Sequence, residues 1–185
     1  MEYVDYYAVV GVSPMACVNS LCSFTSNFPH VRIRNLSFIV SLTERGDPSL
    51  QSMKTVESIN HALSISTSAP NLPIPLASDY LWIPEADLEG ATKNIITGVL
   101  SRTTDGSRVI VDATAGRKIM ASSAVVAALL LSYLHGIPVD INYYLLKAYD
   151  NGTKAKEFSD LEENDALTLV FDTEQILRAF GLEMA

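Results

Sequence analysis

The sequence has few of the residues that bind metals or carry acid–base chemistry. Its 185 residues include only two cysteines and three histidines. Cys17 and Cys22 lie five residues apart in a predicted helix. That spacing suits neither a disulfide nor a metal site, so we expect two reduced thiols in the core. No group of His, Cys, Asp and Glu shows metal-ligand spacing, and we predict neither a metal nor a cofactor.

Positive charge is also scarce, with 13 Lys and Arg against 21 Asp and Glu and a net charge of −8. Such a chain does not present the broad basic face that long DNA or RNA requires. An anionic ligand needs a local basic pocket in this protein. The composition therefore favours a small, enclosed nucleotide over a nucleic-acid partner.

The first residues, MEYVDYY, are acidic and polar, unlike a signal peptide. Ser122, Ser123 and Ser132 interrupt the longest apolar segment, which argues against a membrane span. We expect one soluble, cytoplasmic domain over residues 1–185. Its core covers about residues 3–146, and residues 147–185 add a C-terminal hairpin, a strand and a helix.

Short apolar runs alternate with helical patterns, which predicts a mainly parallel α/β sheet flanked by helices. Pro75 and Pro84 flank one run and favour an edge strand there. The predicted strands cover residues 6–10, 36–42, 76–83, 109–111, 139–146 and 167–171. The predicted helices cover residues 15–24, 49–65, 85–101 and 173–181, and one more follows Lys118 as far as Gly136.

The segment Arg108–Gly136 has the features of an anion-binding loop. A β-branched strand ends in Asp112, and the small residues 113–116 follow it. Arg117 and Lys118 then precede the apolar helix. Small residues let a phosphate approach the backbone, and a helix N-terminus favours negative charge. We therefore predict a phosphate-binding loop at this position.

A second loop, Gly11–Pro14, follows the first predicted strand. Pro14 suits the first position of a helix. Ser13 is either a plain helix cap or a residue whose hydroxyl contacts a ligand. Ligands of parallel α/β sheets bind beyond the carboxyl ends of the strands, where both loops lie. We expect Ser13 and the segment Ala113–Lys118 to line one pocket.

The apolar helix allows two compatible interpretations. Its large side chains surround much of its circumference, which is typical of a helix buried on most sides. One face of the same helix can instead form a subunit interface. The side chains concerned are Val125, Val126, Leu129, Leu130 and Tyr133.

The two loops together resemble the ligand-binding motifs of CARF domains, the Rossmann-like sensors of CRISPR-associated systems. The sequence GVSP at residues 11–14 is similar to the first motif, a GxSP-type turn. The sequence DATAGRKIMAS at residues 112–122 looks like the second motif, in which a small-residue loop precedes a lysine and a methionine-bearing helix start. Family members often have two glycines before that lysine, and this chain departs from the pattern. The resemblance covers roughly residues 3–146.

This resemblance implies a Rossmann-like CARF fold and a homodimer that binds cyclic oligoadenylate across its two-fold axis, with cyclic tetra-adenylate the common ligand. Most members carry a fused effector, for which 185 residues leave no room. The chain thus resembles stand-alone ring nucleases, which degrade the messenger and switch off type III CRISPR signalling. The implied catalytic residues are Ser13, Arg117 and Lys118. The implied ligand-binding residues are Gly11, Val12, Pro14, Thr114, Ala115, Gly116 and Ser122.

Without a metal-ligand cluster, we hypothesise metal-free cleavage in which an RNA 2′-hydroxyl attacks its own phosphate and leaves a 2′,3′-cyclic phosphate. One alternative is a sensor domain of a larger effector or regulator, which binds the ring without cutting it. Another is an enzyme that binds a nucleotide or a methyl donor, since residues 111–116 faintly resemble a methyltransferase loop. No GxGxxG follows the first strand, which disfavours a dinucleotide dehydrogenase.

Overall fold

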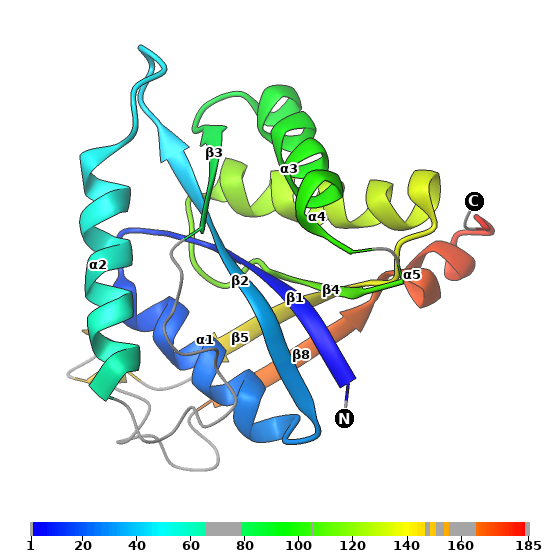
Figure 1. Ribbon diagram of the computed structural model, residues 1–185, viewed down its shortest axis with the longest axis horizontal. Helices are drawn as coiled ribbons and strands as arrows, with labels where there is room; N and C mark the ends of the chain where they lie inside the picture. The colour runs from blue at the N-terminus through cyan, green and yellow to red at the C-terminus, as the bar shows by residue number, and fades with distance from the viewer. Residues whose placement is uncertain are drawn as a thin grey trace.

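A six-stranded sheet forms the centre of the computed structural model (Figure 1), which describes residues 2–65, 79–104, 106–146, 149–150, 154–155 and 166–183. The strand order is β3-β2-β1-β4-β5-β8. Its strands are β1 (Glu2–Val9), β2 (Val31–Leu42), β3 (Asp79–Pro84), β4 (Arg108–Asp112), β5 (Val139–Leu146) and β8 (Ala166–Asp172). The helices are α1 (Pro14–Asn27), α2 (Leu50–Ile65), α3 (Leu88–Arg102), α4 (Lys118–His135) and α5 (Thr173–Ala179).

Strands β1 to β5 run parallel to their neighbours, and only β8 is antiparallel, to β5. The predicted mainly parallel α/β sheet is confirmed, and β3 lies at its edge as the flanking prolines indicate. The hairpin predicted near the start of residues 147–185 lies mostly outside the described residues. Its described part is a small antiparallel pair, β6 (Tyr149–Asp150) and β7 (Lys154–Ala155).

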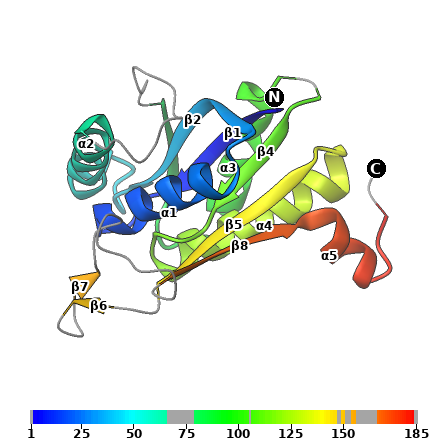
Figure 2. The same ribbon diagram turned by 90° about the horizontal axis from the view of Figure 1, so that it is seen from below.

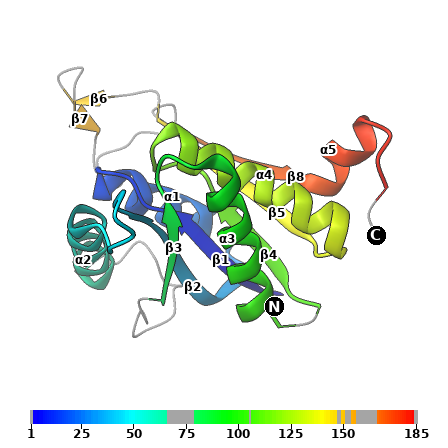
Figure 3. The same cartoon turned by 90° about the horizontal axis from the view of Figure 1, so that it is seen from above.

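Helices cover both faces of the sheet and make a three-layer structure. Figure 2 shows α1 and α2 over one face, and Figure 3 shows α3 and α4 over the other. Each face of the sheet has its own hydrophobic core, and alternate residues of a strand contribute to one or the other. Tyr6 and Phe38 pack under α1 and α2, whereas Tyr7 and Ile39 pack under α3 and α4. All four of these side chains are fully buried. The carboxyl ends of β1 to β4 therefore meet at one edge of a rigid layer.

Helix α4 buries a narrow side made mostly of small residues, including Ala124, Ala127 and Ala128. The five large apolar residues that suggested burial on most sides instead lie on partly exposed positions. Small side chains let α4 approach α3 and the sheet closely, and Val126 lies on the exposed side of the helix. Among the described residues, α4 alone is long and apolar enough to cross a membrane by length and composition, with a mean hydropathy of 1.5. Its packing on α3, α5 and β5 gives its buried side a role within this fold.

Strands β1 and β2 begin earlier than the apolar pattern predicts, at Glu2 and Val31. The reason is a buried charge. Asp5 is fully buried and accepts two hydrogen bonds from Arg34, at 3.1 and 2.7 Å, and one from Asn35 at 2.7 Å. The pairing register of the two strands shifts at the same point. These polar residues extend the strands because they satisfy one another.

Candidate functional site

The two predicted loops contact each other at the carboxyl edge of the sheet. They follow β1 and β4, which are adjacent, with Ala8 paired to Asp112. A Cβ atom on Gly11 would lie 2.6 Å from the backbone nitrogen of Gly116. Gly116 itself has φ +122°, and a Cβ there would lie 2.4 Å from Cγ1 of Val9. Both positions need glycine, and the contact joins the loops backbone to backbone.

The helices that follow these loops have uncapped N-termini. Ser13 and Arg117 occupy the N-cap positions of α1 and α4, and neither side chain makes a capping hydrogen bond. By contrast, the aspartates Asp87 and Asp172 cap α3 and α5. The structure therefore does not support a plain capping role for the exposed Ser13 hydroxyl. The first-turn N–H groups of α1 and α4 remain for solvent or a ligand.

A groove of about 760 Å³ lies beside the second loop. It is lined by the turn after β2, by residues 84–87 after β3, and by Arg117, Lys118 and Ile119. Arg117 also lines a separate small pocket next to Gly11, whereas Ser13 lines neither this pocket nor the groove. Glu44 belongs to the lining. The turn after β2 is thus part of the site, a point that the sequence alone leaves open.

The two cations of the second loop differ in their surroundings. Arg117 forms an ion pair with Glu85, which is only about one-quarter exposed. Lys118 is exposed, lines the groove and forms no ion pair within the described residues. Two more carboxylates, Glu44 and Asp87, line the same groove. Lys118 is therefore the cation most directly available to an anionic ligand.

The other predicted ligand-binding residues take different positions. The Thr114 hydroxyl accepts a hydrogen bond from Tyr144 N at 2.8 Å and shares another with Ser20 at 3.1 Å. Ala115 is buried. Ser122 is exposed one turn after Lys118, and Val12 is 64% exposed on the first loop, beside the half-buried Pro14. Thr114 thus anchors the loop from inside, and Ser122 and Val12 face outward.

A buried hydrogen-bond network under the second loop escapes prediction from sequence. Asp112 accepts hydrogen bonds from the Tyr6 hydroxyl at 2.8 Å and from Thr114 N at 2.9 Å. Asn142 donates to Tyr6 and to Ser20, both at 2.9 Å. The strand-end position of Asp112 is the only sequence signal for it. The network fixes where β4 ends and the loop begins.

Burial, the largest cause, raises the pKa of Asp112 above its ordinary value of 3.8, although the hydrogen bonds from Thr114 and Tyr6 oppose this. Burial likewise raises the pKa of Tyr6 well above its usual range. Cys17 and Cys22 are buried and form no disulfide, and burial raises the pKa of Cys17 as well. Among the described residues no group of three or more His, Cys, Asp or Glu is arranged to hold a metal ion.

The raised pKa of Asp112 gives a testable pH dependence. Because the folded state binds this proton more tightly than the unfolded chain, the resulting stability is full below about pH 3.8 and is lost as pH rises through the folded pKa. Asp112→Asn removes this titration. We expect the unfolding free energy of the variant, relative to wild type, to rise between pH 4 and 7, by about 1.4 kcal/mol per tenfold difference in proton affinity.

The measurement is urea unfolding at several pH values. Asp87→Asn, the same change of residue type at an exposed aspartate, is the matched control. Parallel pH profiles for Asp112→Asn and wild type would contradict the prediction.

The sequence matches no protein-family model and no curated protein. Among solved structures, it is similar to *Enterococcus italicus* Csm6 bound to cyclic hexa-2′-fluoro-hexa-dAMP, with a TM-score of 0.52 and 9% identity over 97% of this chain and 44% of that one. It is also similar to Can2 from *Sulfobacillus thermosulfidooxidans* in complex with cyclic tetra-adenylate, with a TM-score of 0.45 and 13% identity over 76% of this chain and 32% of that one.

At these identities the likeness concerns the fold. The chain spans less than half the length of either neighbour. The sheet order and the likeness to Csm6 support a Rossmann-like, CARF-like fold, as the two sequence motifs predict.

Proposed function

We propose that this protein binds a cyclic oligoadenylate, cyclic tetra-adenylate in the first instance, at the carboxyl edge of its sheet. The observation that carries the proposal is the meeting of two uncapped helix N-termini at one pair of contacting glycine loops. The close packing of Gly11 against Gly116 brings the two helix starts near each other, where first-turn N–H groups favour a phosphate. The fold likeness to Csm6, whose structure holds a cyclic oligonucleotide, supports this class of ligand.

The same site suits a metal-independent ring nuclease. The 2′-hydroxyl of one ribose attacks the adjacent phosphorus, and the bond to the 5′-oxygen of the next nucleotide breaks. The proton of the attacking hydroxyl is lost to water, and the leaving oxygen takes one from water. The products end in a 2′,3′-cyclic phosphate and a 5′-hydroxyl. Lys118 stabilises the added negative charge of the phosphorane, and Ser13 orients the attacking hydroxyl.

The role of Arg117 in this mechanism depends on an ion pair that it already forms. Its guanidinium already pairs with Glu85, so a phosphate competes with that carboxylate for the same donors. Arg117 has a planar fork of donors and can hold a phosphate oxygen while it keeps one contact to Glu85. In this arrangement Lys118 carries most of the charge stabilisation, and Arg117 positions the phosphate.

A sensor that binds the ring without cutting it uses the same residues, and turnover separates the two functions. The test is incubation with cyclic tetra-adenylate in excess EDTA, with products resolved by chromatography and mass. We expect linear products that end in 2′,3′-cyclic phosphate. Lys118→Ala should slow their formation by about a hundredfold or more, because it removes the charge-stabilising cation.

Lys93→Ala is the control for this assay, since Lys93 is an exposed lysine paired with Glu89 on α3. Tight binding with an intact ring would establish the sensor function and exclude the nuclease. Absence of binding would overturn the proposal that the ligand is a cyclic oligoadenylate and would favour the methyl-donor alternative.

The Glu85–Arg117 ion pair predicts that removal of the Glu85 carboxylate increases the affinity for the ligand. Glu85→Gln frees the Arg117 guanidinium and takes one negative charge from the groove. We expect cyclic tetra-adenylate to bind about two- to fivefold more tightly, the range set by ion pairs near the surface. Calorimetric titration measures the change.

Glu89→Gln, which breaks the exposed ion pair with Lys93 on α3, is the matched control and should leave the affinity unchanged. Equal or weaker binding by Glu85→Gln would show that Arg117 does not contact the ligand.

The proposed function includes a homodimer, and the structure offers an apolar surface for it. Tyr143, Leu145, Leu167 and Phe171 are each about 40% exposed, and all four lie on the α4 side of β5 and β8. Leu145 is paired directly with Leu167 across the two strands. Tyr144, between two of these residues, donates its N–H to Thr114, so the surface borders the second loop. Pairing of two copies here would bring both loops to one ligand.

Light scattering at micromolar concentration tests this surface. We expect a mass of twice the 20.1 kDa chain, and a monomer for Leu167→Lys, because a charge on the apolar surface opposes its burial. Leu50→Lys is the control at an exposed leucine on α2 and should stay dimeric. A monomeric wild type in the presence of cyclic tetra-adenylate would refute the dimer.

A further inference from the structure

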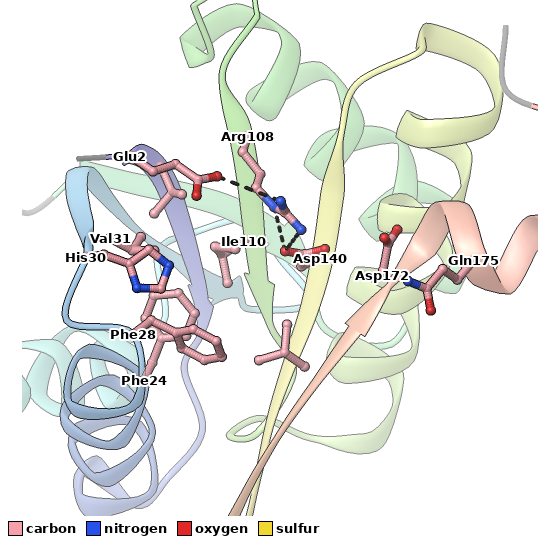
Figure 4. Close-up of a pocket in the computed structure, with 12 residues that line it drawn as sticks. Glu2, Phe24, Phe28, His30, Val31, Arg108, Ile110, Asp140, Asp172 and Gln175 are labelled. Carbon is pink, nitrogen blue, oxygen red and sulfur yellow. Dashed lines mark hydrogen bonds and ion pairs between the residues drawn. The ribbon is translucent and has the colours of Figure 1, made fainter.

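A second cavity, of about 390 Å³, lies at the opposite, amino edge of the sheet (Figure 4). Its walls come from the last turn of α1, from the starts of β1, β4 and β5, and from the junction of β8 with α5. Arg108 opens β4 and Asp140 is the second residue of β5, whereas the proposed oligoadenylate loops follow the far ends of β1 and β4. The cavity is therefore separate from the groove described above.

The inner part of this cavity is apolar and aromatic. The rings of Phe24 and Phe28 lie 5.0 Å apart, and the ring of His30 lies 6.4 Å from Phe28, edge to face. Val4 and Ile110 complete the floor from β1 and β4. The volume falls within the range of small-molecule pockets, and such a floor suits the apolar body of a ligand.

The rim carries more negative than positive charge. Three carboxylates, those of Glu2, Asp140 and Asp172, line the cavity together with one guanidinium, that of Arg108. Arg108 directs Nε and Nη2 to the same Asp140 oxygen, each at 2.7 Å, and Nη1 lies 3.7 Å from Glu2. These ion pairs already use the only guanidinium of the lining. An anion would have to displace a carboxylate, whereas a cation would offset the excess negative charge.

Asp172 is the carboxylate best placed to receive that cation. It lies across the cavity from the aromatic wall, as Figure 4 shows. One of its oxygens, Oδ1, accepts the N–H of Glu174 at 2.9 Å and caps α5. This bond holds the carboxylate in place at the rim. Gln175, in the first turn of α5, adds an amide to the same side.

We propose that this cavity binds a small organic cation: an ammonium or guanidinium group carried on an aromatic or short aliphatic body. The charged group lies against Asp172 at the rim, and the body lies on Phe28 and Ile110. The proposal rests on this cavity alone and holds whether or not the far edge binds oligoadenylate.

The probe is 2-phenylethylammonium, titrated into the full chain and followed through backbone amide chemical shifts. We expect saturable binding with a Kd on the order of 0.1–1 mM, as suits a ligand of this size. The shifts should centre on Phe28 and Gln175 and leave Ser13 and Lys118 unmoved. Phenylacetate, which has the same ring and the opposite charge, should not bind.

Two matched variants test the charge. Asp172→Asn keeps the helix cap, since asparagine caps as well as aspartate, and should weaken binding about tenfold. Asp87→Asn makes the same change at the cap of α3, which lies at the far edge, and should have no effect. Thermal melting shows whether both variants are folded.

Three outcomes would overturn the proposal: no saturable binding, equal affinity in wild type and Asp172→Asn, or shifts centred on the groove at the carboxyl edge. Equal binding of phenylacetate would also refute it, because it would show an apolar pocket with no preference for a cation.

Discussion

The carboxylate of Asp112 determines how the loop edge of this protein is built. It lies buried at the end of β4, and it accepts hydrogen bonds from Tyr6 on β1 and from the backbone of Thr114 in the loop. Asn142 on β5 closes the network. An isolated buried carboxylate is costly, so its partners must stay in place for the fold to be stable. The position of the loop therefore follows from satisfying one buried group.

Anchoring the loop from inside has a consequence for its outer surface. The Thr114 hydroxyl is hydrogen-bonded to Ser20 and to the backbone N–H of Tyr144, and these bonds restrain the loop. Gly116 therefore passes close to Val9. The chain then enters α4 with its first N–H groups uncapped and Lys118 exposed. The stability of the network and the uncapped start of α4 thus depend on the same few residues.

Much of this fold can be predicted from local patterns, and the parts that cannot depend on distant partners. The bounds of β5 match the prediction, and Pro14 begins α1, because apolar alternation and a fixed φ act locally. The predicted start of β1, at residue 6, was wrong. In the sequence Asp5 has the character of a surface residue, and only the fold places Arg34 beside it. The interpretation of α4 as a helix buried on most sides was wrong for a related reason, since only tertiary packing selects the alanine side for burial.

The candidate site shows the same division. Glycines, a serine and two cations at strand ends are visible in the sequence, and the structure packs Gly11 of the first loop against Gly116 of the second. The predicted pocket shared by Ser13 and the second loop is not the groove, which Arg117 and Lys118 line without Ser13. The ion pair between Arg117 and Glu85 cannot be predicted from the sequence. The two residues are 32 positions apart, and Glu85 belongs to neither of the two motifs. This pair changes how the site handles charge. The groove holds three carboxylates and two cations inside a chain of net charge −8, so overall charge does not attract an anion. Any attraction of an anion to this groove would act at close range, through backbone N–H groups and Lys118, which forms no ion pair with another described residue.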